Sequence, residues 1–181
     1  MWHNGSPVAQ IEKSGVTENL IRLHTDHLAT TRLATDNTGK VVWRWDGEAF
    51  GATLPNEDPD GDGVLVALNL RFPGQYADVE TGLFYNYFRY YDPKVGRYIT
   101  SDPIGLDGGD NTYRYVGNDP LGNFDPFGLF QIIPPPGLTF PEMVKFNQTP
   151  AAKQYRRLLN ALAERFKRDL KKICPDGAKD I

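Results

Sequence analysis

The stretch "DVETGLFYNYFRYY", residues 78–91, decides the fold class. It opens with an Asp four residues before a Gly, which is typical of a tight turn, and continues as an aromatic run. Interpreted as one strand, it has two aromatic faces, and we expect both to be covered. One face holds Leu83, Tyr85, Tyr87, Arg89 and Tyr91, and the other holds Phe84, Asn86, Phe88 and Tyr90. "DNTGKVVWRW" (36–45) and "DPKVGRYIT" (92–100) repeat the turn and strand, so the sequence predicts a mainly β fold of short antiparallel strands.

Composition supports this prediction and removes several classes of protein. The 181 residues include 18 Gly, 14 Pro, 9 Tyr, 10 Phe and 3 Trp, as expected of many strands joined by turns. No run approaches the roughly 18 apolar residues of a membrane span, so we expect no transmembrane segment. Cys174 is the single cysteine, which excludes an internal disulfide and a four-cysteine zinc site. We expect no cofactor and no bound metal.

Charge divides the chain near Leu129. Residues 1–129 hold 10 Lys and Arg against 18 Asp and Glu, whereas residues 130–181 hold 10 against 5. The word "PPPG" (134–137) follows the change of sign. We therefore predict two parts, a β region at 1–129 and a tail at 130–181.

The tail is predicted to contain one amphipathic helix over residues 149–173. Thr149 caps it, Pro150 takes the first position, and Pro175 and Gly177 end it. Its apolar stripe consists of Tyr155, Leu158, Leu159, Leu162, Phe166, Leu170 and Ile173. Its other face carries Lys153, Arg156, Arg157, Arg165, Lys167, Arg168, Lys171 and Lys172. That face is either solvated charge or a binding surface for an acidic partner, such as nucleic acid or anionic lipid.

Two short motifs raise the question of metal binding. "DPDGDG" (58–63) begins like a calcium-binding loop, but Asn69 stands where such a loop needs a bidentate Glu, so we interpret it as a polar surface loop. "HTDH" (24–27) offers two imidazoles, yet on a strand His24 and His27 point to opposite sides. Neither motif predicts a metal site.

Three long words carry a family resemblance. They are "LHTDHLATTRLATDNTGKVVWRWDGEAFG" (23–51), "LRFPGQYADVETGLFYNYFRYYDPKVGRYITSDPIGLDGG" (70–109) and "NTYRYVGNDPLGNFDPFGL" (111–129). Over residues 7–129 the chain resembles the core-associated end of bacterial Rhs proteins, also called YD-repeat proteins. The resemblance implies the final strands of a hollow β shell with a plug segment, followed by a variable toxic tail. Ala29 and Thr31 stand where the family usually has Gly and Pro, which we expect to alter one turn.

The resemblance also implies a chemistry. Members of the family cut their own chain after the Leu of "DPxGL", which places the cut here between Leu129 and Phe130. It assigns the reaction to two aspartates, which correspond to Asp102 and Asp125. Arg89 or Arg97 is expected to assist by setting the protonation of the pair or by binding a carbonyl oxygen.

The expected partners are the upstream Rhs shell, in the same chain or another one, and a cognate immunity protein. The resemblance places the Rhs protein in the bacterial cytoplasm before delivery into target cells. The alternative is a scaffold, or an orphan Rhs end, that does not cleave and whose tail only binds.

Overall fold

The computed structural model describes residues 1–3, 5–14 and 17–133. The chain divides into two compact units, Met1–Pro141 and Glu142–Ile181, and every described residue belongs to the first. The predicted helix at 149–173 lies outside the described residues, and the boundary after Leu129 stays a prediction. No helix of the described part is long and apolar enough to cross a membrane.

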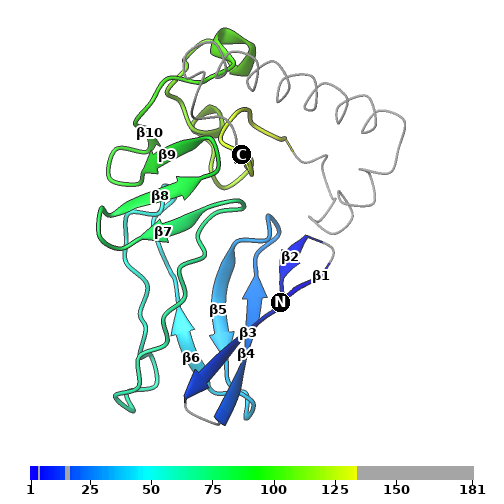
Figure 1. The fold of residues 1–181 in the computed structure, drawn as a ribbon, viewed down its shortest axis with the longest axis vertical. Helices are drawn as coiled ribbons and strands as arrows, with labels where there is room; N and C mark the ends of the chain where they lie inside the picture. The colour runs from blue at the N-terminus through cyan, green and yellow to red at the C-terminus, as the bar shows by residue number, and fades with distance from the viewer. Residues whose placement is uncertain (4, 15–16, 134–181) are drawn as a thin grey trace, which may run out of the picture. The chain divides into compact units, whose positions relative to one another are not determined.

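Strands dominate the first unit, which confirms the predicted β-rich, antiparallel character (Figure 1). One antiparallel sheet has the order β3-β4-β5-β6, and a two-stranded ribbon β1-β2 precedes it. The bounds are β1 Trp2–His3, β2 Ser6–Pro7, β3 Ala9–Ser14, β4 Thr17–Thr25, β5 Thr31–Thr35 and β6 Val41–Arg44. The turn between β5 and β6 is the predicted one, because the Asp36 carboxylate accepts hydrogen bonds from the N–H groups of Thr38 and Lys40. Gly39 completes this turn at φ +89°, a conformation that glycine adopts without strain.

A second antiparallel sheet has the order β10-β9-β8-β7. Its bounds are β7 Tyr76–Asp78, β8 Leu83–Asn86, β9 Arg89–Asp92 and β10 Arg97–Tyr98. Residues 78–91 are thus a turn and a hairpin, and the prediction of one continuous strand was wrong. The chain reverses at Tyr87 and Phe88, with Tyr87 at φ +53°, so that Asn86 pairs with Arg89.

This reversal changes which side chains share a face. Phe84, Asn86, Arg89 and Tyr91 all point inward and are buried, whereas Tyr85 and Tyr90 point outward and are 42% and 39% exposed. The expectation that both faces are covered therefore fails within the described part of the chain. Arg89 moves from the predicted Tyr85 face to the face of Asn86, which is the face that holds the candidate site.

One aromatic core serves both sheets. Trp43 and Trp45 come from β6 and its end, Tyr91 and Tyr98 come from β9 and β10, and Tyr115 comes from the segment that follows. These five side chains are at most 1% exposed. The Tyr91 and Tyr115 rings lie 4.5 Å apart, and Tyr98 meets both at 5.7 to 6.1 Å. The core therefore fixes β10 and residue 115 firmly, and the candidate site is built on these elements.

Arg71 is a buried cation at the edge of this core. It donates hydrogen bonds to the carbonyl oxygens of Leu68 and Leu70, and its guanidinium lies over the rings of Trp45 and Phe84 at 5.3 and 5.5 Å. Burial lowers its pKa to about 10. These contacts hold the long segment between the sheets, which supplies no strand of its own, against the core.

Candidate active site

Arg89, Asp102 and Asp125 lie together in the interior, although the sequence separates them widely. The Nη2 atom of Arg89 is 2.8 Å from Oδ2 of Asp102 and 3.5 Å from Oδ2 of Asp125. All three residues are at most 7% exposed. The pair of aspartates and one of the two candidate arginines thus form a single buried cluster.

Asp125 holds the backbone that leads to the predicted cleavage site. Its Oδ1 atom accepts hydrogen bonds from the N–H groups of Phe127 (3.3 Å), Gly128 (2.8 Å) and Leu129 (3.1 Å). Gly128 sits at φ +69°, and a Cβ there would collide with the backbone of β8. The Asp-Pro-x-Gly-Leu word is therefore a turn organised by its own aspartate.

Asp102 lies beside the other end of that turn. Its Oδ1 atom accepts a hydrogen bond from the Ile104 N–H at 3.0 Å. The segment after it forms a short 3₁₀ helix, η1 (Gly105–Gly108), which ends against the site. A Cβ on Gly108 would lie 2.6 Å from Oδ2 of Asp102 and 2.7 Å from the carbonyl oxygen of Leu129. Because Gly108 has no side chain, the Asp102 carboxyl and the Leu129 carbonyl both reach the same small space.

Arg89 ties these segments together from β9. Its Nε atom donates to the Gly128 carbonyl oxygen, and its Nη1 atom donates to the Thr112 carbonyl oxygen at 2.9 Å. Its remaining nitrogen serves the two carboxylates. The guanidinium therefore orients the turn and the acids at once, as a planar donor group is suited to do.

Charge and burial conflict at this cluster. With both acids ionised, the three groups would carry a net negative charge in the interior, which is unfavourable. Burial raises the pKa of Asp102 above its usual value, and the charge of Asp125 adds to this rise. Burial likewise raises the pKa of Asp125, against the opposing effect of the hydrogen bond from Tyr98. Burial therefore favours the protonated form of each acid, and the charge of Arg89 opposes it at both.

The predicted scissile bond lies in a closed loop. Leu129 is 6% exposed, and beyond it Ile132 pairs with Phe124 in an antiparallel bridge. Two backbone hydrogen bonds of 3.2 and 2.7 Å make this bridge. Residues 125–131 are therefore held at both ends, with the Leu129–Phe130 bond between the two anchors.

Comparisons with known proteins place this chain in a family context. The chain is 43% identical over 122 residues, 66% of its length, to "Double-stranded DNA deaminase toxin A" of Burkholderia cenocepacia. It is 57% identical over 60 residues, 33% of its length, to "Probable deoxyribonuclease RhsA" of Dickeya dadantii. Over 65% of its length, the chain has a fold similar to a crystal structure of TcdB2-TccC3 without the hypervariable C-terminal region, with a TM-score of 0.56 and 29% sequence identity. No family model matches the chain.

The chain carries an Rhs-associated core region. It spans 8% of the length of the deaminase toxin, 4% of RhsA and 6% of the TcdB2-TccC3 chain. The shared part is thus a small section of long toxin-related proteins.

Arg97 is the other arginine that the sequence offers as an assistant of the aspartate pair. This side chain is exposed, whereas Tyr98 beside it is buried, because neighbouring residues of β10 point to opposite sides. Arg97 lines a surface cleft of about 340 Å³ together with Lys94 and Arg114. Arg89, not Arg97, is the arginine that meets the aspartates.

One turn of the Rhs core region contains an alanine with left-handed backbone. Ala29, which stands where the family usually has Gly, adopts φ +68°. The Asp26 carboxylate stabilises this turn by accepting hydrogen bonds from the N–H groups of Leu28 and Thr30. Left-handed backbone at an alanine is unfavourable by about 1 kcal/mol or more, so the substitution leaves strain in the turn.

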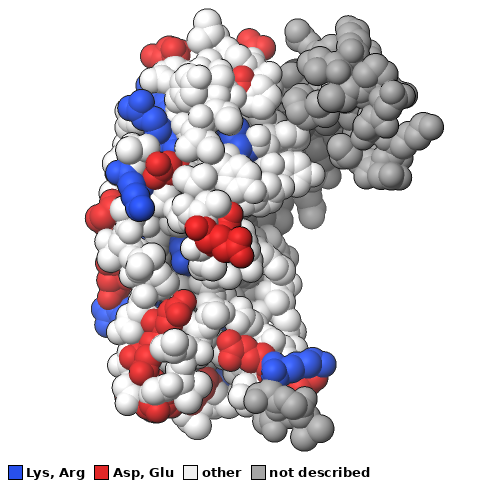
Figure 2. All heavy atoms as spheres, turned by 60° about the vertical axis from the view of Figure 1, so that its left-hand side comes forward, with Lys and Arg blue, Asp and Glu red and all other residues white. Residues whose placement is uncertain are grey.

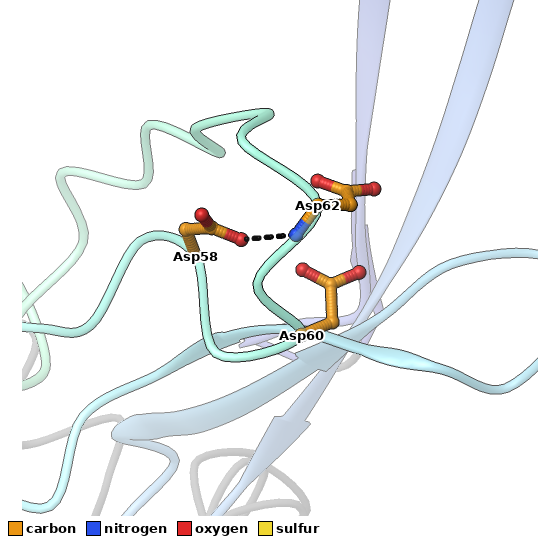
Figure 3. A group of neighbouring side chains, drawn as sticks. All are labelled: Asp58, Asp60 and Asp62. Carbon is orange, nitrogen blue, oxygen red and sulfur yellow. Dashed lines mark hydrogen bonds between the residues drawn. The ribbon is translucent and has the colours of Figure 1, made fainter.

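Lys40 contacts the acidic loop (residues 58–63) of the Rhs core region. Asp58, Asp60 and Asp62 each offer an oxygen within 4.8 Å of the others (Figure 3). The Lys40 ammonium lies 2.7 Å from the Asp60 carboxylate, and the hydrogen bond between them raises the pKa of Lys40. Asp58 meanwhile accepts hydrogen bonds from the N–H groups of Asp62 and Gly63. The loop is thus organised by the contact with the Lys40 ammonium and by turn hydrogen bonds.

The histidines of "HTDH" contact protein groups. His24 Nε2 lies 2.9 Å from the Thr35 hydroxyl, and His27 Nε2 lies 3.0 Å from the Leu121 carbonyl oxygen. His24 lies on β4, whereas His27 lies in the turn after that strand ends at Thr25, so the interpretation of both as residues of one strand was wrong.

Sequence reasoning did not single out three residues that complete the site of the Rhs core region. Tyr98 donates to Asp125, Asn86 donates to Tyr98, and Gly108 leaves room for Asp102 and Leu129. Tyr98 and Asn86 lie within aromatic strand words and resemble core residues in sequence. The one available signal was Asn86, a polar amide in an otherwise aromatic run.

Proposed function

We propose that this chain is the C-terminal portion of a bacterial Rhs toxin and that it cuts its own backbone between Leu129 and Phe130. The observation that supports this most strongly is the shared space at Gly108, where the Asp102 carboxyl and the Leu129 carbonyl oxygen converge. Asp125 holds the preceding N–H groups, and Arg89 lies between the two acids. Two carboxyls, a cation and a constrained carbonyl are the groups that hydrolysis of a peptide bond needs.

The proposed reaction uses one water molecule and no cofactor. The ionised aspartate takes a proton from the water as its oxygen attacks the Leu129 carbonyl carbon. The protonated aspartate polarises the carbonyl oxygen, and Arg89 balances the charge of the pair. The C–N bond then breaks as a proton passes to the Phe130 nitrogen, which leaves a carboxylate at Leu129 and an amine at Phe130. Each chain turns over once.

The released tail, residues 130–181, is proposed to be the effector. Its expected basic helix would bind an acidic surface, either nucleic acid or anionic lipid. On the face shown in Figure 2, Lys and Arg lie interspersed with Asp and Glu, so this face offers no continuous basic area for a phosphate backbone. Residues 130–181, with 10 Lys and Arg against 5 Asp and Glu, are the proposed site of such contacts, and a cognate immunity protein would act on them.

The shell of a larger Rhs protein is the proposed partner of the first unit. Three exposed tyrosines, Tyr76, Tyr85 and Tyr90, lie in register across β7, β8 and β9 on the outer face of the second sheet. A row of exposed aromatic residues on a sheet is suited to packing against further strands. The enclosing protein would remain in the bacterial cytoplasm until it is delivered to a target cell.

The test is the intact mass of the expressed chain. We expect two fragments that meet between Leu129 and Phe130, and a single uncut chain near 20.3 kDa for Asp102→Asn and for Asp125→Asn. Asp107→Asn is the matched control, because Asp107 is exposed in η1 and should leave the cut unchanged.

A second function has its own support. The three backbone hydrogen bonds of Asp125 are those of an ordinary turn and require no catalysis. An uncut wild-type chain would therefore assign the region to scaffolding, with the tail attached.

A further inference from the structure

Tyr98 occupies an unusual position between the catalytic groups. Its hydroxyl lies 2.8 Å from Oδ2 of Asp125, and its ring lies beneath the Arg89 guanidinium, with Cζ 3.6 Å from the ring centroid. The residue is 1% exposed. It thus touches two of the three proposed catalytic groups and has almost no contact with water.

The neighbouring Asn86 fixes the direction of the Tyr98 hydrogen bond. The Asn86 amide nitrogen lies 3.0 Å from the Asp125 carbonyl oxygen and 2.8 Å from the Tyr98 hydroxyl oxygen. Because a carbonyl oxygen can only accept, the atom beside it must be the amide N–H₂ group, which donates to Tyr98 as well. The hydroxyl hydrogen of Tyr98 is then free to point to Asp125.

The donors around the two acids are unequal. Asp125 accepts from the N–H groups of residues 127, 128 and 129 and from the Tyr98 hydroxyl. Asp102 accepts a hydrogen bond from the Ile104 N–H and lies closer than Asp125 to the Nη2 atom of Arg89, at 2.8 Å against 3.5 Å. Donated hydrogen bonds favour the ionised form of a carboxyl, so the larger set favours an ionised Asp125. Arg89 acts the other way by favouring an ionised Asp102, and the Tyr98 hydroxyl is the contact that offsets it.

We propose that Tyr98 is a positioning residue of the self-cleavage site, whose hydroxyl keeps Asp125 as the ionised member of the pair and leaves the shared proton on Asp102. This inference rests on the proposed function. It assigns the roles that the pair alone leaves open: Asp125 takes the proton of water, and Asp102 polarises the Leu129 carbonyl that it faces across Gly108.

Tyr98→Phe removes the hydroxyl and keeps the ring against Arg89 and the core. The matched control is Tyr115→Phe, because Tyr115 is equally buried, its ring lies 5.7 Å from that of Tyr98, and its hydroxyl has no hydrogen-bond partner among the described residues. Both variants lose one buried hydroxyl from the same cluster. Only Tyr98→Phe removes a hydrogen bond to Asp125, since Tyr115 faces Asp125 without one.

The first experiment starts from uncut chain that is recovered under denaturing conditions. The chain is refolded at a series of pH values from about 4 to 8, and the rate of cleavage is measured at each pH. Loss of a hydrogen bond to a carboxylate raises the pKa of Asp125 by about one to two units. The acidic limb of the rate profile should therefore move to higher pH by about that amount in Tyr98→Phe, and not in Tyr115→Phe. The other groups that face Asp125 are Arg89, Asp102 and Tyr115, and none of them changes in Tyr98→Phe.

A second experiment needs no cleavage. In the uncut Asp102→Asn chain, Asp125 titrates without a coupled partner, so its carboxyl carbon can be followed by NMR against pH. Adding Tyr98→Phe should raise the measured pKa of Asp125, and adding Tyr115→Phe should not.

The outcomes separate the two proposals. If wild type refolds uncut at every pH, the proposed function fails and this inference falls with it. If wild type is cut and Tyr98→Phe shows an unshifted profile, or merely a uniform loss of rate, Tyr98 has only a packing role and the inference is overturned while self-cleavage stands. An unchanged Asp125 pKa in the NMR titration would overturn it equally.

Discussion

Gly108→Ala should stop or greatly slow cleavage without changing any charged group. The added Cβ would lie 2.6 Å from Oδ2 of Asp102 and 2.7 Å from the Leu129 carbonyl oxygen. Carbon and oxygen normally approach to about 3.3 Å, so each oxygen must retreat by roughly 0.6 Å. Displacing reacting groups by about 1 Å lowers a rate by about 100-fold, and we expect a loss of about 10- to 100-fold here. Crowding should also destabilise the fold by about 1–3 kcal/mol.

The assay is the fraction of cut chain over time during refolding, measured by intact mass, with stability measured by urea denaturation of the uncut chain. Gly61→Ala is the control for an added Cβ that meets open space; Gly61 is left-handed at φ +71° and Gly108 is not, so any loss of stability in this control reports backbone strain without crowding. If Gly108→Ala is cut at the wild-type rate, Asp102 and Leu129 do not meet in the reactive state, and the proposed geometry is wrong.

Three further changes have defined outcomes. Ala29→Gly should stabilise the chain by a few tenths to about 1 kcal/mol in urea denaturation, because relief of about 1–2 kcal/mol of backbone strain exceeds the roughly 0.8 kcal/mol lost with one buried methyl. Arg89→Met should leave the chain uncut and less stable than Asp102→Asn by about 3–5 kcal/mol at neutral pH. The raised pKa values of both acids mean that this loss grows as the pH rises above the usual aspartate range and shrinks in acid to the part that comes from the lost hydrogen bonds to the Gly128 and Thr112 carbonyl oxygens, which denaturation at several pH values would show. The isolated tail, residues 130–181, should bind anionic vesicles or nucleic acid less tightly as salt increases, and a lack of binding at low salt would mean that its basic face is only solvated.

The sequence predicted the strand content because its signals are local. Asp36 accepts from the backbone N–H groups that follow it, and Gly39 takes the left-handed conformation, so this turn can be inferred from neighbouring residues alone. The reversal at Tyr87 has no such signal. A left-handed tyrosine without a glycine is stabilised by tertiary contacts, including aromatic packing with Phe88 and Phe127. Alternation alone therefore placed Arg89 on the wrong face.

The site was predictable only in part, for a related reason. Asp102 and Asp125 were named through a family resemblance, Arg89 was one of two arginines on the strands before Asp102, and no local pattern shows that the three meet. Tyr98 and Gly108 depend on distances between segments far apart in sequence. A tyrosine in an aromatic strand is usually a core residue, and its contact with Asp125 is visible only once β10 and the 125–129 turn are placed together.

This dependence on tertiary structure bears on when the proposed cut can occur. Arg89 comes from a hairpin, Tyr98 from the edge of the same sheet, Asp102 from the segment before η1, and Asp125 from the turn that also carries the scissile bond. In the unfolded chain an isolated aspartate has no arginine nearby, no shared proton and no held carbonyl, so the bond has the stability of any peptide bond. Only packing of the aromatic core, which fixes Tyr98 and Tyr115, brings the four segments to one place. Self-cleavage would then follow folding. Destabilising the core at Trp43, a fully buried residue of β6, should therefore keep the chain uncut while Arg89, Asp102 and Asp125 are all still present.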